Sequence, residues 1–553
     1  MAPPHASSDR LASADPHAAP SQLFDIAIIG AGILGSALAY SLGTSGRTVL
    51  LLERDLSEPD RIVGELLQPG GCLALQKVGI DDTLDGIDAT PCEGYEVFWG
   101  DKSVRIPYPE ESKEMRWSGQ GDKERKQEGR SFHHGRFVQN LRKKALGAQG
   151  VTMVEATVND LLEDAEGTIV GVKASPRQPP STSSSDSPSP LEFRAKLTIV
   201  ADGCMSKFRR ALLPPHVTPI TRSHFVGLVL EDASLPAPHH GHVILGKSDP
   251  SSPSLSPSPS DPSAPTLGPV LVYQLATHET RMLVDIRGPK LPSQSTLASF
   301  LREHVTPVLP PSIRPSFASA LDKSLTGDRA YRLRSMPNSY LASYPQGRGV
   351  QGAFLAGDSL NMRHPLTGGG MTVALNDVVL LTELLGGGKD VASTKGDGRG
   401  VIELGNWLEM SERLEEWHWK RKKVASCVNI LSMALYSLFG ADDENLEVLK
   451  TGCFKYFELG GDCVAGPVSL LSALRPSPTL LFYHFFRVAF YSIYILFTSP
   501  VLPASSSSSS STDPVKARKP ALWQYPALTL RSFKVFWTAC VVFLPVLWSE
   551  GQM

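Results

Sequence analysis

The pattern of hydrophobic and polar positions divides the chain into an α/β body and an apolar helical end. An apolar run at 25–29, a glycine-rich turn, a helical stretch at 34–45 and a second apolar run at 48–53 open the chain. Two strands joined by a helix predict a βαβ unit and a parallel sheet. Alternation at 281–286 predicts an antiparallel sheet in the middle. From about Trp407 onward the pattern becomes helical and apolar.

Segments rich in Ser and Pro interrupt this pattern at 176–190, 247–267 and 504–514. Such compositions cannot bury enough apolar surface to become ordered. Because β-like runs flank the first segment, at 168–174 and 192–201, it is predicted to be a disordered hairpin loop.

Composition excludes several classes of protein. A length of 553 residues allows two or three domains, and a formal net charge of -2 argues against a nucleic-acid binder. The 7 cysteines stand singly, without CxxC or zinc spacing, which indicates reduced thiols in a cytosol-like compartment. The pair His133–His134 has no third ligand at metal-binding spacing, so no metal is expected. Residues 1–22 lack the apolar core of a secretory signal and predict a disordered leader.

A glycine-rich turn follows the first predicted strand and opens the first predicted helix. It reads Gly30-Ala31-Gly32-Ile33-Leu34-Gly35. Its glycines suit a tight turn, close approach of the backbone to a pyrophosphate, and packing of the helix on the strand. The helix N-terminus offers N–H groups to phosphates, and Glu53 ends the second strand where a ribose-binding carboxylate belongs. The pattern predicts a dinucleotide site; the alternative is a glycine turn in another α/β protein.

Two later segments separate FAD from NAD, which the glycine turn alone does not. One predicted strand ends in Asp202-Gly203, and another ends in Gly357-Asp358 before a glycine-rich turn and a helix. Together with the first turn, this trio is similar to the single-component flavoprotein hydroxylase fold. The resemblance implies that the Asp358 carboxylate binds the ribitol region of FAD. The alternative for Asp358 is a helix cap.

Longer motifs narrow the resemblance to one family. They are ERDL at 53–56, EPDRIVGE at 58–65, LQPGG at 67–71, FHHGRF at 132–137, LVDIRG at 283–288, NMRHPLTGGGM at 361–371 and GGDCVAGP at 460–467. From about Asp25 onward the chain resembles the squalene monooxygenase (squalene epoxidase) family. It departs from that family in the Ser/Pro inserts and in its short leader.

The resemblance assigns residues to the cofactor and to the chemistry. It implies FAD contacts at Gly30, Gly32, Ile33, Leu34 and Gly35; at Glu53, Arg54 and Arg61 on the adenosine side; at Leu66, Arg136, Arg142 and Val158; and at Asp202, Asp358, Gly369 and Met371. For Arg142 the alternative is a solvated helix residue. The resemblance also implies that Gln68 and Tyr95 form a hydrogen-bonded catalytic pair between flavin and substrate. The alternative for Tyr95 is an ordinary core tyrosine.

The implied activity is FAD-dependent epoxidation of squalene to (S)-2,3-epoxysqualene with O2, in sterol biosynthesis. Because squalene has no polar group, its binding must come from apolar burial. No second dinucleotide motif is visible, and the resemblance implies electrons from NADPH through a partner, NADPH–cytochrome P-450 reductase. The implied location is the cytosolic face of the endoplasmic reticulum membrane, with lipid droplets as a second location.

Two apolar segments, at 480–498 and 533–548, predict membrane attachment. The first contains His484 and Arg487, and the second would span only about 24 Å as a helix. A monotopic or re-entrant anchor is therefore expected in place of two full spans. The adjacent run Lys420-Arg421-Lys422-Lys423 suits an anionic lipid surface. The alternative is a soluble protein with buried core helices.

The sequence thus predicts a mixed α/β fold, with a Rossmann-like FAD-binding domain, a β-sheet substrate domain and a C-terminal helical membrane region. The predicted segments are a leader at 1–22, FAD-binding parts at 23–93, 131–215 and 346–400, substrate parts at 94–130 and 216–345, and the membrane region at 401–553. Two other functions remain open: a flavin-dependent reductase of prenyl chains, and a membrane lipid carrier without catalysis.

Overall fold

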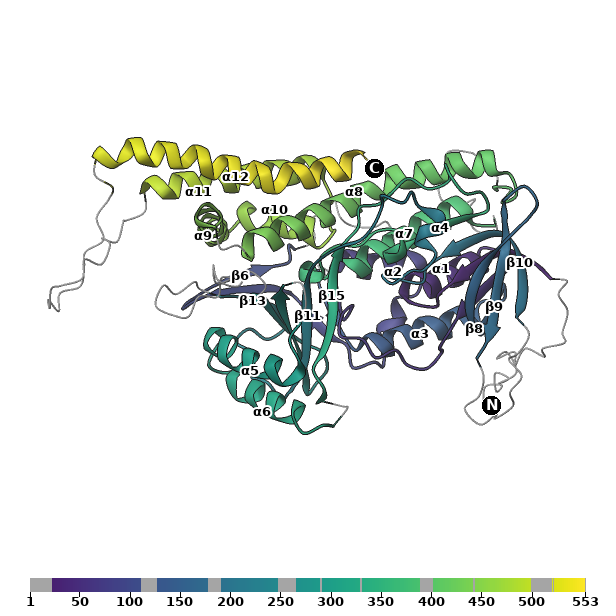
Figure 1. Ribbon diagram of the computed structural model, residues 1–553, viewed down its shortest axis with the longest axis horizontal. Coiled ribbons are helices and arrows are strands. Elements are labelled where there is room, and N and C mark those ends of the chain that lie inside the picture. The colour runs from purple at the N-terminus through teal and green to yellow at the C-terminus, as the bar shows by residue number, and fades with distance from the viewer. Residues whose placement is uncertain are drawn as a thin grey trace.

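The computed structural model describes residues 22–110, 127–177, 190–246, 265–288, 291–328, 331–387, 401–440, 443–498, 520 and 522–552. Residues 1–21 of the predicted leader and most of each Ser/Pro insert lie outside these residues. The described part is a mixed α/β structure with a C-terminal helical layer (Figure 1), which confirms the predicted fold class. The domain boundaries stay a prediction.

A six-stranded sheet forms the first half of the body. Its strands are β1 (Leu23–Ile29), β2 (Val49–Glu53), β8 (Val151–Glu163), β9 (Ile169–Pro176), β10 (Leu191–Val200) and β16 (Ala353–Leu355). β16, β10, β1, β2 and β8 run parallel, in that order. β9 pairs antiparallel with the far end of β8 and with the near end of β10. The predicted hairpin on either side of the first insert is therefore confirmed.

Three helices pack around this sheet and surround its core. They are α1 (Ile33–Thr44), α3 (His134–Gly147) and α7 (Gly370–Leu385). α1 is apolar almost throughout, and nine of its residues are buried between α3 and α7. A helix that is apolar all round belongs in a protein interior. α1 therefore holds its N-terminus at the carboxyl edge of the parallel strands.

A seven-stranded sheet forms the second half of the body. Its order is β15 (Arg334–Tyr340), β11 (Ile220–Glu231), β14 (Glu279–Arg287), β13 (Thr266–Gln274), β12 (His240–Leu245), β5 (Gly94–Trp99) and β6 (Lys102–Pro107). Only the β5–β12 pair is parallel. α5 (Gln294–His304) and α6 (Arg314–Ser324) bury one face of this sheet. The other face packs in a buried cluster with Leu66, Leu366 and Tyr436, which lie outside this sheet.

A small sheet joins the two halves. It consists of β3 (Leu66–Leu67), β7 (Gly129–Ser131) and β4 (Thr90–Cys92), with α2 (Pro69–Val78) directly after β3. Gln68 lies between β3 and α2, so the backbone changes direction at this residue. Its side chain is thereby held at the junction of the two large sheets.

Five helices form the C-terminal layer. They are α8 (Trp407–Phe439), α9 (Glu444–Glu458), α10 (Asp462–Leu471), α11 (Pro478–Thr498) and α12 (Tyr525–Gln552). α11 and α12 lie side by side along one face of the molecule (Figure 1). α12 is longer than the predicted apolar segment, because its helix begins eight residues earlier. At about 42 Å it is long enough to span a bilayer, so the length argument against a span was wrong.

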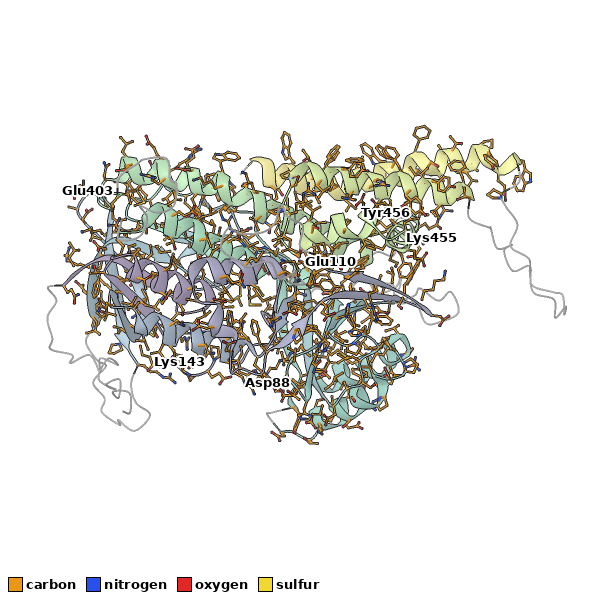
Figure 2. The ribbon with its side chains drawn as sticks, turned by 180° about the vertical axis from the view of Figure 1, so that it is seen from behind. Asp88, Glu110, Lys143, Glu403, Lys455 and Tyr456 are labelled. Atoms are coloured by element: carbon orange, nitrogen blue, oxygen red, sulfur yellow. The ribbon has the colours of Figure 1, made fainter. Side chains whose placement is uncertain are left out.

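Both terminal helices are long and apolar enough to cross a membrane, and less than a quarter of the most apolar stretch of each helix is buried in the protein. This contradicts the alternative of buried core helices and is compatible with membrane association. The exposed large side chains include Phe482, Tyr483, Phe490 and Tyr494 of α11, and Phe533, Trp537, Val541 and Trp548 of α12. In Figure 2 this apolar face runs along the upper edge, above Tyr456 of α9.

The basic run at 420–423 does not form one surface. Arg421 is buried in an ion pair with Asp377 of α7, and Lys422 contacts the backbone oxygen of Glu550. Only Lys420 and Lys423 are exposed. Consecutive residues of a helix point about 100° apart, so four of them cannot share a face. The prediction that the whole run faces an anionic surface was wrong.

Candidate functional site

The glycine turn forms a cradle at the N-terminus of α1. Gly30 has a φ of +102°, and a Cβ there would lie 2.5 Å from the oxygen of Ala201. A Cβ on Gly35 would lie 1.9 Å from the oxygen of Gly30. At Gly32 a Cβ would meet no atom of the described residues within 4 Å. The turn therefore combines tight packing on two sides with open space at its centre.

Glu53 and Arg142 fix the loops beside this cradle. Glu53 Oε2 accepts a hydrogen bond from Ala31 N at 2.9 Å. Arg142 donates to the oxygens of Ala31 at 2.9 Å, Ser57 at 3.1 Å and Asp55 at 3.2 Å. The Arg142 side chain is only 5% exposed, so the interpretation as a solvated helix residue was wrong.

Arg209 ties together the two aspartate turns. It belongs to α4 (Arg209–Leu212) and is buried. Its guanidinium donates to the oxygens of Ser359 at 2.8 Å, Cys204 at 3.0 Å and Asp358 at 3.1 Å. The turn after β10 and the turn after β16 are thereby held side by side. Arg209 and Arg210 are neighbouring arginines that the sequence alone does not distinguish. The packing shows that Arg209 is buried and Arg210 is exposed.

The Asp358 side chain is exposed within η6 (Gly357–Ser359). No side-chain cap is present at this turn, so the helix-cap alternative finds no support. A Cβ on Gly357 would lie 3.2 Å from Leu34 Cδ1, which places this turn against the start of α1. The Asp358 carboxylate therefore stands beside the glycine cradle. Burial raises the pKa of the other turn's carboxyl group, Asp202.

The other predicted cofactor residues are spread more widely. Leu66, Val158 and Met371 are buried, Ile33 is half-buried, and Arg54 and Arg61 are exposed. Arg136 donates to the oxygen of Ile87 at 3.5 Å and forms no hydrogen bond with the described residues of the cradle. A Cβ on Gly369 would lie 2.3 Å from Val428 Cγ1. The glycine therefore allows α8 to pack closely against this turn.

The cradle fits the diphosphate of a dinucleotide. The N-cap of α1 is Gly32, and no side chain caps it or places an acid in the first turn. The first N–H groups of a helix then remain available to an anion. A carboxylate at Glu53 and another at Asp358 flank this position. The residues therefore fit a ribose, diphosphate and ribitol laid across the edge of the sheet.

Gln68 and Tyr95 lie at the junction of the two sheets and are hydrogen-bonded. Gln68 Nε2 donates to the Tyr95 hydroxyl and, at 2.7 Å, to the oxygen of Thr367. The Tyr108 hydroxyl donates to Gln68 Oε1 at 2.6 Å. All three side chains are buried, and burial raises the pKa of both phenols above their usual range. Both tyrosines therefore stay protonated at physiological pH.

Tyr108 was missed in the sequence, although a signal was present. Val104 and Ile106 of β6, and Tyr108 just after its end, are buried and alternate with Ser103, Arg105 and Pro107. Ile106 pairs with Tyr95 of β5. A period of two on an edge strand predicts inward side chains. The hydroxyl among them marks a polar group that needs a buried partner.

A buried ion pair lies beside this cluster. Arg281 of β14 donates to both carboxylate oxygens of Glu65 at 2.8 Å, and the Tyr273 hydroxyl donates to Glu65 Oε2 at 3.1 Å. Glu65 precedes β3, so the pair anchors the segment that ends at Gln68. His133 and His134 contact different partners, Glu279 and the oxygen of Gly64. Burial lowers the pKa of His134 to about 4.

Known proteins resemble this chain in sequence and in fold. The family model for squalene epoxidase matches residues 194–256 and 264–507. Squalene epoxidase erg1 of Schizosaccharomyces pombe is 40% identical, over 95% of this chain and 98% of that protein. Squalene epoxidase 3 of Arabidopsis thaliana is 42% identical, over 85% of this chain and 77% of that protein.

Solved structures agree in fold at lower identity. The p-nitrophenol 4-monooxygenase PnpA of Pseudomonas putida has a TM-score of 0.57 at 16% identity, covering 83% of this chain and 98% of that one. PqsL of Pseudomonas aeruginosa, described as a probable FAD-dependent monooxygenase, has a TM-score of 0.52 at 18% identity, covering 76% and 97%. The squalene epoxidases of Schizosaccharomyces pombe and Arabidopsis thaliana align with 95% and 85% of this chain, and the chain belongs to the squalene epoxidase family.

Proposed function

We propose that this chain is an FAD-dependent monooxygenase that converts squalene to its 2,3-epoxide in sterol biosynthesis. The observation that carries the proposal is family membership over nearly the whole length, joined to a cradle that fits FAD. FAD, when bound, supplies the activation of O2. The cradle at Gly30–Gly35, with Glu53 and Asp358, would hold the cofactor.

The chain's own residues position and shield the reaction. Gln68, Tyr95 and Tyr108 satisfy one another's polar groups, so these three side chains present no unpaired donor to an apolar chain. Their neighbours in the buried cluster include Leu271, Leu283 and Phe225. Squalene binds through apolar contact alone, worth about 25 cal/mol per Å². A dry, apolar wall also limits reaction with water.

A product assay tests the proposal against its alternatives. The purified chain, loaded with FAD, is supplied with squalene, O2, NADPH and a flavoprotein reductase. We expect a product heavier than squalene by one oxygen atom. A product heavier by hydrogens would indicate the prenyl reductase, and a colourless protein that binds squalene without turnover would indicate the lipid carrier.

The electron source and the location are finer proposals. We propose that NADPH delivers electrons through NADPH–cytochrome P-450 reductase, because the described residues contain one dinucleotide cradle, which FAD would occupy. We also propose attachment to the endoplasmic reticulum membrane, facing the cytosol. The exposed apolar face of α11 and α12 and the seven unpaired cysteines support this location.

We expect Tyr95→Phe to lower the rate of epoxidation about tenfold while FAD content stays normal. The change leaves one Gln68 N–H without a partner, which costs about 1–3 kcal/mol in a buried site. Gln68→Ala should do more, since Tyr95, Tyr108 and Thr367 all lose a partner. The measurement is turnover of both single variants and of the double variant, each with its flavin absorbance.

A less-than-additive double variant would show that the two residues act as a unit. Tyr456→Phe is the matched control, because Tyr456 is also a buried, hydrogen-bonded tyrosine but lies on α9 and bonds His484. Strict additivity, or normal turnover in Tyr95→Phe, would identify the pair as ordinary packing.

We expect the triple variant Phe490→Ser, Phe533→Ser, Trp537→Ser to bind lipid vesicles at least about tenfold more weakly. These side chains are 59%, 71% and 71% exposed, so their loss removes apolar contact with lipid but little internal packing. Deleting α11 and α12 would be a poorer test, because both helices also bury residues against α8 and α9.

Vesicle sedimentation measures the loss, with unchanged circular dichroism as the check on folding. The matched control replaces Met205, Ile220 and Leu325 by Ser, which are exposed apolar residues outside the C-terminal layer. Equal binding by the two triple variants would place the membrane contact elsewhere.

A further inference from the structure

His364 begins the turn that carries Thr367, and both of its ring nitrogens have partners. Nδ1 accepts the N–H of Leu366 at 3.2 Å and so caps η7 (Pro365–Thr367). A neutral histidine that accepts at Nδ1 carries its proton on Nε2. Nε2 lies 3.1 Å from Ser223 Oγ and 3.5 Å from Asp285 Oδ1. The ring is 1% exposed, so protein atoms surround it.

The partner of His364 is a carboxylate inside the seven-stranded sheet. Asp285 of β14 is fully buried, and its Oδ1 accepts hydrogen bonds from Ser223 Oγ of β11 and, at 3.1 Å, from Asn338 Nδ2 of β15. A Cβ on Gly268 would lie 2.2 Å from Asp285 Oδ2, so the sheet makes room for this carboxylate. A buried carboxylate is costly unless donors surround it. Three neighbouring strands thus hold a fixed acceptor, the Asp285 carboxylate, for the hydrogen bonds that link His364, Ser223 and Asp285.

The third side of His364 is held by α8. Its ring stacks on Tyr436 with 4.0 Å between centroids, and Ser432 Oγ donates to the His364 oxygen at 2.5 Å. The guanidinium of Arg287 covers the Tyr436 ring at 4.7 Å. The sheet and α8 therefore hold His364 from three directions. The oxygen that this turn presents, at Thr367, accepts from both Gln68 and Tyr95.

We propose that His364 is a positioning residue for epoxidation, which couples the Asp285 carboxylate of the substrate sheet to the placement of the Gln68–Tyr95 pair. Nε2 binds the turn to Ser223 and Asp285, and Nδ1 sets the shape of the turn through Leu366. Thr367 then presents its oxygen at a fixed place. The inference rests on the proposed function of the pair, and the experiment separates the two.

Two substitutions divide the roles of the ring. His364→Asn keeps an acceptor near the place of Nδ1 and loses the link to Asp285. His364→Gln keeps a donor near the place of Nε2 and loses the cap on Leu366. We expect each to lower kcat about tenfold, with KM and FAD content little changed, because small misplacements at a reacting centre are costly. The epoxide formed per NADPH consumed should fall as well.

Hydrogen–deuterium exchange of the peptide at 361–371 reports on the turn without using activity. We expect faster exchange in both His364 variants and in Asp285→Asn. His242→Gln is the matched control, because His242 is also 1% exposed, lies in the sheet that holds Asp285, and also accepts a backbone N–H, from Ala237. It should leave the exchange of this peptide unchanged.

A double variant with Tyr95→Phe decides whether His364 acts through the pair. We expect the loss caused by His364→Gln to be several-fold smaller in the Tyr95→Phe background than alone. Additive losses, or exchange no faster than in His242→Gln, would overturn the inference. Failure of the proposed pair shows separately, as normal turnover in Tyr95→Phe; the exchange measurement then still decides whether His364 holds the turn.

Discussion

Asp358→Ala purifies with little or no FAD. The Asp358 side chain is exposed at the end of β16, beside the start of α1 and the glycine cradle. A carboxylate that accepts hydrogen bonds from a ligand contributes about 1.5–3 kcal/mol to binding. Its loss therefore weakens FAD binding about ten- to hundredfold. The chain loses activity with its cofactor, and it also loses the stability that bound FAD supplies.

Flavin absorbance per protein after gel filtration measures the occupancy, and titration of the apoprotein with FAD gives the dissociation constant. Asp322→Ala is the matched control, since Asp322 is an exposed aspartate on α6 that pairs only with Arg302 among the described residues. Normal affinity in Asp358→Ala would remove this residue from the cofactor site. Because the backbone oxygen of Asp358 accepts from Arg209, the substitution leaves that contact in place.

Arg421→Ala destabilises the protein by about 3–5 kcal/mol, the usual cost of leaving one charge of a buried pair without its partner. Arg421 donates from Nε and Nη2 to the two oxygens of Asp377, both at 2.8 Å, and both side chains are 1% exposed. The pair joins α8 to α7, the helix that follows the glycine-rich turn. Chemical denaturation in detergent, followed by tryptophan fluorescence, measures the loss.

Neighbouring residues on the same helix provide the controls. Lys420→Ala and Lys423→Ala should change stability by less than about 0.5 kcal/mol, since both side chains are exposed. Replacing the pair together, Arg421→Met with Asp377→Leu, should recover much of the stability, because no charge is then left buried alone. Equal losses of stability in Lys420→Ala, Arg421→Ala and Lys423→Ala would mean that the buried pair contributes no more to stability than an exposed lysine does.

The parts of the fold that follow from local pattern were predicted well. The βαβ start, the hairpin around the first insert and the beginning of α8 at Trp407 lie where the periodicity places them. The extent of α12 was not predicted, because Arg531 and Ser532 stand directly before the predicted apolar segment while the helix continues through them. Hydropathy reports which residues prefer lipid, and backbone hydrogen bonds decide where a helix begins.

The motifs in the sequence predicted the candidate site, but the residues that hold those motifs in place were not predicted. The glycine turn, Glu53 and the two aspartate turns stand together at one edge of the sheet, as parallel strands require. Arg209, Asp285 and His364 depend on contacts between distant segments, which no spacing encodes. The basic run at 420–423 is the instructive error: charge in the sequence does not say which side chains turn inward on a helix.

The hydrogen bond from Gln68 to the Thr367 oxygen joins residues 299 positions apart. Contacts so distant in sequence must close a long loop before they contribute, which slows their formation. During synthesis, Gln68 and Tyr95 leave the ribosome well before their acceptor at Thr367 and before α8, which holds that turn. The early part of the chain therefore carries Gln68 and Tyr95 without the oxygen that accepts from both of them until translation has passed residue 440. Chaperone binding during that interval would protect the nascent sheet from aggregation.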